Sequence, residues 1–350
     1  MKAKSVAEIP LSSIRIGRDL KTYEKTAKGW KRSSQEFPEA LQAIKLFKSH
    51  GRFAELIDKK DKKFLKGYLY RNEVKGARIN ILPNGRKLNK AYSLFAPSLA
   101  IHDQHSHDHW DVMYKNPNGQ YAYVYTFDKV NASKREKYKK VHEFEKIFPK
   151  LRRNVAIALR KHEPLALPME TLLNTYIRVG NEIYYKLHKH KGLTTLMKKD
   201  VEIKKGFVTF HYLGKDGVPI EICKQFPREY LVQLSSVLKR ISNDDYIFTN
   251  QQGKILKEKD FKEAFKRYCG KEFYPHIVRS YIATEKAKKF LKSRKSATKQ
   301  EINALFASIA SELGHKRFDK KTEEWKDSYN VTIHHYIQPD LVEKIQGLCG

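Results

Sequence analysis

Five side chains in the C-terminal half of the chain are of types that can act together on a phosphodiester: Arg178, Lys215, Arg279, His315 and Tyr336. Arginine, lysine and histidine offer N–H donors that suit phosphate oxygens, and a tyrosine hydroxyl can serve as a nucleophile. Such a set fits attack of a tyrosine on a phosphodiester without a metal ion. The formal net charge of +31 over 350 residues also attracts a polyanion, the partner that this chemistry needs.

The positive charge is spread along the chain and is not gathered in one tail. Runs rich in lysine and arginine occur at residues 59–63, 134–140 and 286–289. Each run alone is most simply a solvated helix face, and net charge alone would also fit a protein that binds RNA or an anionic membrane. The spread over the whole length favours a protein that encircles or cradles a duplex.

Cysteine usage and hydropathy indicate the compartment. The chain has three cysteines and no CxxC pair, which argues against a disulfide framework or a thiolate zinc site and for a reducing environment. No apolar run is long enough to span a bilayer, and Lys2 and Lys4 are not followed by the apolar segment of a signal peptide. We expect an intracellular, DNA-associated protein that is not integral to a membrane.

The pattern of residue types changes within the N-terminal part, at about residue 77. Residues 1–76 match no domain that the sequence identifies, although residues 38–48 and 53–66 favour helices. From residue 77 to 130, β-like segments such as 121–127 alternate with Pro/Asn/Gly turn sequences. We predict a small mixed, β-containing domain over residues 77–130.

The C-terminal part is predicted to be mostly helical. Residues 131–160 show apolar residues at helical spacing and should form a linking helix that Pro149 kinks or divides. Within residues 161–350, tight turn sequences join β-like segments at 201–203, 207–213 and 218–222, which predicts a three-stranded antiparallel sheet between helices. The predicted fold class is therefore α+β.

Arg178 and Lys215 each have an ordinary alternative explanation. Arg178 follows an apolar, helix-like segment, where it either meets an anion or forms a salt bridge with Glu182. Lys215 lies in a turn between Gly214 and Gly217, and lysines in turns are usually only solvated. A turn tip can also insert a flexible ammonium into a groove and donate a proton to a leaving oxygen.

The other three positions are also individually weak. His276 and Arg279 are three residues apart at a predicted helix start, so they can grip one phosphate or form a buried structural pair. His315 closes an apolar helix, where a histidine often only meets the helix dipole. Tyr336 precedes an amphipathic helix, and most of the 20 tyrosines are expected to be structural.

Taken in chain order, these segments resemble the type IB DNA topoisomerases, particularly their compact viral and bacterial branch. The resemblance is specific over about residues 150–345. The matching segments are Ile177-Arg178-Val179-Gly180-Asn181-Glu182, Gly192-Leu193-Thr194-Thr195-Leu196, Gly214-Lys215, Arg279-Ser280-Tyr281, Leu313-Gly314-His315 and Tyr336-Ile337-Gln338-Pro339. It extends weakly to Tyr121 and Tyr123, which look like the family's DNA-contacting aromatic segment.

The resemblance implies a mechanism and a partner. Tyr336 would attack a DNA phosphodiester and form a 3′-phosphotyrosyl link, so that the freed 5′-hydroxyl strand can rotate and relieve supercoiling before religation. Arg178, Arg279 and His315 would hold the non-bridging oxygens, and Lys215 would protonate the leaving 5′-oxygen. The implied enzyme is a monomer that clamps double-stranded DNA, with no cofactor, no metal and no ATP.

The sequence departs from the family in two places. His276 stands where the family usually has lysine, as in the HxxR motif of tyrosine recombinases, and we expect it to contact DNA. The separation of His315 and Tyr336, 336 − 315 = 21, is longer than in the compact members, and residues 316–329 form an inserted charged segment. Tyr329 is therefore a rival nucleophile, but we prefer Tyr336 because of the Ile-x-Pro that follows it.

A histidine-rich segment at residues 102–109 could in principle bind a metal ion. The segment contains His102, Asp103, His105, His107, Asp108 and His109. Its spacing is one residue short of the HxHxDH metallohydrolase pattern, so we favour a phosphate-facing or solvated loop over a metal site. A tyrosine recombinase and a non-catalytic DNA-binding protein remain as alternatives, but the β-like residues 77–127 favour the topoisomerase over a recombinase with a helical N-terminal domain.

Overall fold

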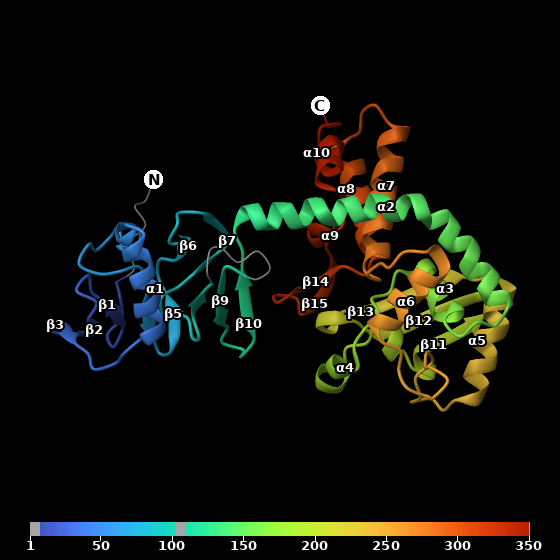
Figure 1. Cartoon of the computed structure of the whole chain (residues 1–350), viewed down its shortest axis with the longest axis horizontal. Coiled ribbons are helices and arrows are strands. Elements are labelled where there is room, and N and C mark those ends of the chain that lie inside the picture. Colours follow the sequence, from blue (N-terminus) through green and yellow to red (C-terminus); the bar gives the residue numbers. More distant parts are fainter. Residues whose placement is uncertain (1–7, 103–109, 350) are drawn as a thin grey trace. The chain divides into compact units, whose positions relative to one another are not determined.

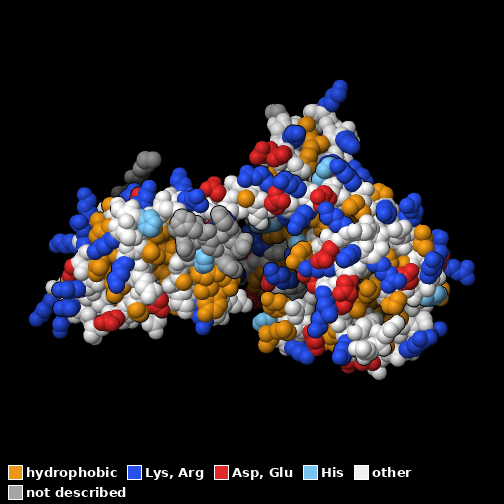
Figure 2. Space-filling model, viewed as in Figure 1, with side chains coloured by type: hydrophobic (Ala, Val, Ile, Leu, Met, Phe, Trp, Pro, Cys, Tyr) orange, Lys and Arg blue, Asp and Glu red, His pale blue; other side chains and the backbone are white. Residues whose placement is uncertain are grey.

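The computed structural model describes residues 8–102 and 110–349. The chain divides into two compact units, residues 1–136 and 137–350, and we describe each by itself (Figure 1). Helices and small antiparallel sheets occur together, so the predicted α+β class is confirmed. On the face shown in Figure 2, Lys and Arg side chains are scattered over both units, as the distribution of charge in the sequence indicates.

The N-terminal unit begins with a five-stranded sheet in the order β3-β2-β1-β4-β5. Its strands are β1 (Ile14–Ile16), β2 (Thr22–Thr26), β3 (Gly29–Arg32), β4 (Tyr68–Tyr70) and β5 (Glu73–Lys75). Arg15 is buried in this unit, forms an ion pair with Asp58 and lies 4.6 Å from the centre of the Phe64 ring. A buried guanidinium needs such partners because leaving it unpaired would cost several kcal/mol.

One of the two helix predictions for the N-terminal unit is wrong. Helix α1 (Pro38–Ser49) is present and buries Ala40, Ala43, Ile44 and Phe47. The predicted helix over residues 53–66 is only a short 3-10 turn, η1 (Phe53–Leu56). The charged run at 59–63 supplies no apolar stripe for a longer helix, and Leu65 instead donates a backbone hydrogen bond to Ile16 at the end of β1.

Short strands complete the N-terminal unit, where the sequence predicted β-like segments. A two-stranded sheet contains β6 (Ile79–Ile81) and β7 (Lys87–Tyr92), and a three-stranded sheet has the order β10-β9-β8. The strands of the second sheet are β8 (Ala100–Ile101), β9 (Val112–Lys115) and β10 (Tyr121–Val124). The role of residues 77–130 as a separate clamp domain stays a prediction.

Most of the histidine-rich segment lies outside the described residues. His105, His107, His109, Asp103 and Asp108 fall in the undescribed stretch, whereas the ring of His102 packs edge-on against Trp110 with 5.2 Å between ring centres. Over residues 8–102 and 110–349, no group of three or more His, Cys, Asp or Glu side chains is arranged to hold a metal ion.

The linking helix is α2 (Phe127–Arg160), which contains Pro149 and is continuous, so the proline does not divide it. Figure 1 shows that the helix curves along its second half. Val141, Phe144, Leu151 and Val155 recur on one face and are buried. This face anchors α2 in the core of the C-terminal unit.

The C-terminal unit surrounds the predicted three-stranded sheet with helices. The sheet has the order β11-β12-β13, with β11 (Val201–Lys204), β12 (Phe207–Leu213) and β13 (Pro219–Gln225) all antiparallel. The helices are α3 (Ala166–Thr175), α4 (Glu182–His188), α5 (Arg228–Arg240), α6 (Glu258–Cys269), α7 (Ile277–Ser293), α8 (Lys299–Glu312), α9 (Asn330–His335) and α10 (Pro339–Gln346). Helices α7, α8 and α10 pack side by side (Figure 1).

The inserted segment between His315 and Tyr336 is a β-hairpin. It consists of β14 (Lys316–Asp319) and β15 (Glu324–Asp327), and Phe318 faces Trp325 across the two strands. The backbone N–H of Ser328 donates to the carbonyl of His315 and closes the base of the hairpin. No helix among the described residues is both long and apolar enough to cross a membrane.

The core of the C-terminal unit yields a stability prediction. The Phe144 ring is fully buried among the rings of Phe148, Phe265, Phe273 and Tyr281, with centres 5.1 to 5.9 Å away. We expect Phe144→Ala to lower the free energy of unfolding of this unit by about 3–5 kcal/mol, because it leaves a cavity between α2, α6 and α7.

Urea unfolding followed by circular dichroism measures this loss. Phe207→Ala is the matched control, because Phe207 lies in the same unit but is exposed. Its cost should stay below about 1 kcal/mol. Equal destabilisation by the two substitutions would contradict the assigned core.

Candidate active site

The loop that carries Arg178 is held by two glycines. Helix α3 ends at Tyr176, which has a left-handed backbone (φ 58°) and turns the chain toward Arg178. The carbonyls of Arg178 and Val179 accept the N–H groups of Leu193 and Thr194, each at 2.8 Å. A Cβ atom at Gly192 would lie 2.6 Å from the Cα of Gly180, so this close backbone approach requires glycine. The glycine-containing motifs therefore position Arg178.

Arg178 contacts the hydroxyl of Tyr336. Its Nη2 donates to Tyr336 Oη at 2.7 Å, across 158 residues of sequence. The alternative salt bridge with Glu182 is not formed, since Glu182 pairs with Lys186 at 2.7 Å. Arg178 thus places a charged N–H donor directly on the oxygen of Tyr336.

Arg279 is the buried centre of the cluster. Arg279 is only 4% exposed, and its guanidinium donates to the carbonyls of Tyr176 and Leu313, each at 2.6 Å. Burial lowers the pKa of Arg279, although an arginine stays charged in proteins. Its Nε atom is also buried and has no hydrogen-bond partner within the described part of the chain.

His315 lies against Arg279 at the start of the hairpin. Its Nε2 atom is 3.1 Å from Arg279 Nη2, and its Nδ1 atom is 2.8 Å from Thr332 Oγ1. Burial first, and then the neighbouring charge of Arg279, lower the pKa of His315 to about 3. The further groups that lower it are Arg178, His276 and His335. The ring is therefore neutral near pH 7, and it does not act as a charged helix cap.

Tyr336 is surrounded by these groups, whereas no described hydrogen bond or ring contact joins the Tyr329 side chain to them. Tyr336 follows α9 and is 3% exposed, with its ring centre 4.6 Å from that of His315 and 5.3 Å from the guanidinium carbon of Arg279. Tyr329 donates instead to Asn303 Oδ1 at 3.1 Å and packs against Phe306.

His276 sits one helical turn before Arg279, at the N-cap of α7. Its ring centre is 5.2 Å from that of Tyr336, although part of the residue is exposed to solvent. The surrounding protein, and then the charges of Arg178 and Arg279, lower the pKa of His276 to about 3. A neutral imidazole therefore lies beside the Tyr336 ring.

Lys215 is set apart from the other four predicted residues. It lies in the 3-10 turn η4 (Lys215–Gly217) between β12 and β13, and its side chain is 67% exposed. Its ammonium is 3.9 Å from Asp216, and its charge is among those that lower the pKa of His276. The structure thus brings Arg178, Arg279, His315 and Tyr336 into contact and leaves Lys215 on a neighbouring exposed turn.

Sequence reasoning missed two residues that touch this cluster. Lys137 of α2 donates to the carbonyl of His335, and its Nζ atom is 5.4 Å from the centre of the Tyr336 ring. Thr332 of α9 is fully buried and bonds His315. No local motif marks either residue, because both contacts join distant segments.

The predicted DNA-contacting tyrosines lie in the N-terminal unit. Tyr121 and Tyr123 alternate with the partly and fully buried Ala122 and Val124 on β10, so they share the outer face of this sheet. Their side chains are 48% and 44% exposed. Such exposed aromatic residues are available for contact with a partner.

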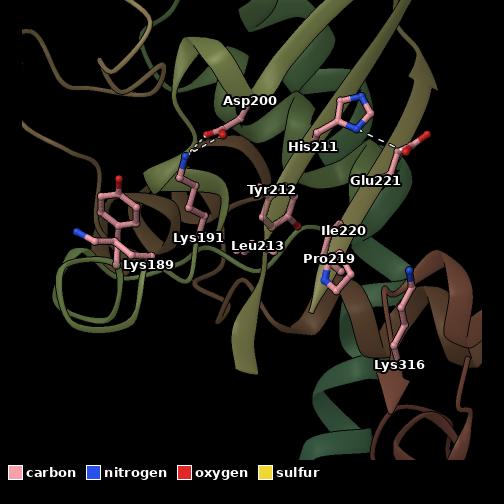
Figure 3. A pocket seen from close by; sticks show the side chains of 11 residues that line it. Lys189, Lys191, Asp200, His211, Tyr212, Leu213, Pro219, Ile220, Glu221 and Lys316 are labelled. Carbon is pink, nitrogen blue, oxygen red and sulfur yellow. Dashed lines mark hydrogen bonds and ion pairs between the residues drawn. The ribbon is translucent and has the colours of Figure 1, made fainter. Parts of the chain in front are cut away.

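A separate cavity of about 640 Å³ lies beside the Lys215 turn (Figure 3). Its wall includes Tyr212, Ile220 and Lys316, together with a buried ion pair in which Lys191 Nζ is 2.6 Å from Asp200 Oδ2. None of the five predicted residues lines it. The cluster of Arg178, Arg279, His315 and Tyr336, the cationic cluster, is therefore distinct from this cavity.

The comparisons with known proteins agree with the geometry. DNA topoisomerase 1B of Acanthamoeba polyphaga mimivirus is 27% identical over 218 residues, which cover 56% of this chain and 64% of the viral protein. The chain thus spans less than two thirds of the length of that relative.

Solved structures of a recombinase also match. The XerH site-specific recombinase on palindromic difH substrate, in a post-cleavage complex, has a TM-score of 0.33 and 15% identity, over 56% of this chain and 50% of that one. Its pre-cleavage complex has a TM-score of 0.31 and 15% identity, over 47% and 45%.

A family model covers the linking helix, the sheet and the cationic cluster together. The model of the eukaryotic DNA topoisomerase I catalytic core matches residues 128–337, more than half of the chain. The matched range contains all five predicted residues and ends directly after Tyr336. The chain therefore belongs to the type IB DNA topoisomerase family.

Proposed function

We propose that this protein relaxes supercoiled duplex DNA by transient cleavage of one strand through a 3′-phosphotyrosyl intermediate, without ATP or a metal ion. The observation that carries the proposal is the 2.7 Å hydrogen bond from Arg178 to the hydroxyl of Tyr336. It joins a buried tyrosine to a cluster of cationic side chains. A tyrosine that only supported the fold would not need this charge around its oxygen.

In the proposed cleavage step, Tyr336 Oη forms a bond to phosphorus and the bond from phosphorus to the 5′-oxygen breaks. Negative charge grows on the non-bridging oxygens as the phenol proton is released. Arg178 and Arg279 stabilise this charge with N–H donors that are already in place. The unpartnered Nε of Arg279 is a donor available to a phosphate oxygen.

Religation reverses this step and needs no external energy. The phosphotyrosyl bond is a phosphodiester like the bond that it replaces, so the free 5′-hydroxyl can attack it after the strand has rotated. Fixed guanidinium groups take the place that a divalent ion holds in many phosphoryl-transfer sites. We therefore assign no cofactor to the proposed reaction.

Lys215 is the proposed general acid for the leaving 5′-oxygen. Its exposure on the turn between β12 and β13 leaves its ammonium free to move toward a bound strand. Gly214 and Gly217 flank it, and Gly217 has a left-handed φ of 76°. A mobile donor on a tight turn fits a group that acts only when DNA is bound.

Double-stranded DNA is the proposed partner, bound by a monomer through both units. The net charge of +31 and the spread of Lys and Arg over the surface suit a polyanion (Figure 2). His276 beside Tyr336, and the exposed Tyr121 and Tyr123, are proposed contacts.

A tyrosine recombinase is the second candidate. The observation that favours it is His276, which makes an HxxR motif with Arg279. The two candidates share the covalent step, but a recombinase must exchange strands between two duplexes. Joining of two labelled duplexes by the purified protein would favour the recombinase.

The first test concerns the nucleophile. Tyr336→Phe keeps the ring and its packing but removes the attacking oxygen, so it should abolish plasmid relaxation and the denaturant-stable protein–DNA adduct while duplex binding persists. Tyr329→Phe removes a hydroxyl that bonds only Asn303 among the described residues, and it should leave both activities near the wild-type level. An adduct formed by Tyr336→Phe and lost in Tyr329→Phe would move the nucleophile into the inserted segment.

A second test concerns Lys215. Lys215→Ala should slow cleavage of an ordinary strand by about 10²- to 10⁴-fold, the usual contribution of a general acid. It should slow cleavage far less when sulfur replaces the leaving 5′-oxygen, because a thiolate leaves without a proton. Lys205→Ala is the matched control, since it removes an exposed lysine from the other turn of the same sheet. Equal slowing on both substrates would contradict the general-acid role.

A further inference from the structure

Thr332 is a fully buried polar residue to which neither the family motifs nor the proposed chemistry gives a role. It lies in α9, four residues before Tyr336, and its relative exposure is 0%. Its hydroxyl oxygen is 2.8 Å from His315 Nδ1. This contact holds the hydroxyl and the imidazole in place only if one of the two atoms carries the proton of the hydrogen bond and the other accepts it. The location of that proton therefore has to be established.

The neighbours of His315 determine that location. A guanidinium has only N–H donors, so the 3.1 Å contact with Arg279 Nη2 requires that His315 Nε2 accept a hydrogen bond. The ring is then neutral with its proton on Nδ1, and this N–H donates to Thr332 Oγ1. The lowered pKa of His315, about 3, agrees with a neutral ring.

The backbone of Thr332 also holds the tyrosine. Its carbonyl accepts the N–H of Tyr336 at 2.9 Å and that of Ile337 at 3.2 Å. One residue thus bonds the His315 ring through its side chain and the Tyr336 segment through its main chain. The β14–β15 hairpin leaves the chain after His315 and returns before Thr332, so this contact closes the insertion next to the site.

We propose that Thr332 is a positioning residue of the site, which orients His315 with its proton on Nδ1 and ties that ring to the segment that carries Tyr336. The inference rests on the proposed function, because the orientation matters for a phosphate bound beside Tyr336.

The threonine hydroxyl can keep the same bond through the reaction. When a phosphate oxygen displaces Arg279 Nη2 from His315 Nε2, the ring can take a second proton from solvent and Nε2–H then donates to that oxygen; the negative phosphate favours this proton. In the neutral ring and in the imidazolium, Nδ1–H donates to Thr332 Oγ1. The ring therefore does not have to rotate between the DNA-free and DNA-bound states.

The test uses three variants of the full chain. Thr332→Val replaces the hydroxyl by a methyl group of similar size, and Thr332→Ser keeps the hydroxyl. Thr171→Val is the control for loss of a buried hydroxyl, since Thr171 bonds Leu167 and Tyr230 and contacts neither His315 nor Tyr336 in any described interaction.

Two readouts separate positioning from a merely structural role. The first is the ¹⁵N NMR spectrum of the histidine side chains without DNA, in which His315→Gln identifies the His315 signals. The second is the single-turnover rate of adduct formation on a duplex.

We expect a protonated Nδ1 and an unprotonated Nε2 for wild-type His315, for Thr332→Ser and for Thr171→Val. In Thr332→Val, Arg279 still keeps the proton on Nδ1, but the Nδ1–H loses its acceptor, so its NMR signal should shift and its exchange with water should become faster. Cleavage should slow by about 10- to 100-fold, the usual cost of removing a group that orients a functional histidine. Thr332→Ser should cleave within a few-fold of the wild type.

Three results would overturn the proposal. They are an unchanged His315 Nδ1–H signal in Thr332→Val, a wild-type cleavage rate in that variant, or loss of the Nδ1–H signal in Thr332→Ser. The NMR spectrum of Thr332→Ser still tests the proposal if Thr332→Val does not fold. If the wild-type protein forms no adduct, the proposed function fails, whereas the NMR experiment still decides whether Thr332 accepts the Nδ1–H of His315.

Discussion

The burial of the Arg279 guanidinium is the interaction on which the rest of the site depends. Its N–H groups hold the carbonyl at the end of α3, the carbonyl at the end of α8 and the ring of His315. Two segments far apart in sequence, around residues 176 and 313–315, therefore meet at this one side chain of α7. A buried cation is costly unless its donors find acceptors, so these carbonyls are needed for the charge to be tolerated.

This arrangement concentrates positive charge before any anion has bound. Arg178 and Arg279 both lie beside Tyr336. Burial first, and then the charges of these two arginines, lower the pKa values of His276 and His315. Keeping both imidazoles neutral limits the repulsion within the folded protein. In the proposed function, a bound phosphate would relieve the remaining unfavourable charge, so the cluster would be preorganised for an anion at some cost in stability.

Local patterns predicted a large part of the C-terminal unit. Turn sequences after residues 203 and 213 identified the three-stranded sheet, and motif order identified Arg178, Arg279, His315 and Tyr336, which the structure brings together. The sheet was predictable because each of its turns is a short segment with a characteristic sequence. The catalytic roles of the four residues stay predictions.

Features that depend on distant contacts were not predictable in this way. Strands β1 to β5 are only three to five residues long, too short for a clear alternation of apolar and polar residues. The contact of Lys137 with the carbonyl of His335 spans 198 residues, and that of Thr332 with His315 spans a hairpin that no pattern indicated. The helix expected over residues 53–66 was wrong because its charged run has no apolar face.

Relaxation of supercoiled plasmid by the purified protein, in EDTA and without ATP, tests the central claim most directly. A fixed cationic cluster and a phosphotyrosyl bond supply what a metal ion and ATP would otherwise provide. We expect both negatively and positively supercoiled plasmid to be converted to relaxed topoisomers, with a protein-linked nick trapped by denaturant. Absence of relaxation under these conditions, with activity restored only by magnesium or ATP, would contradict the account.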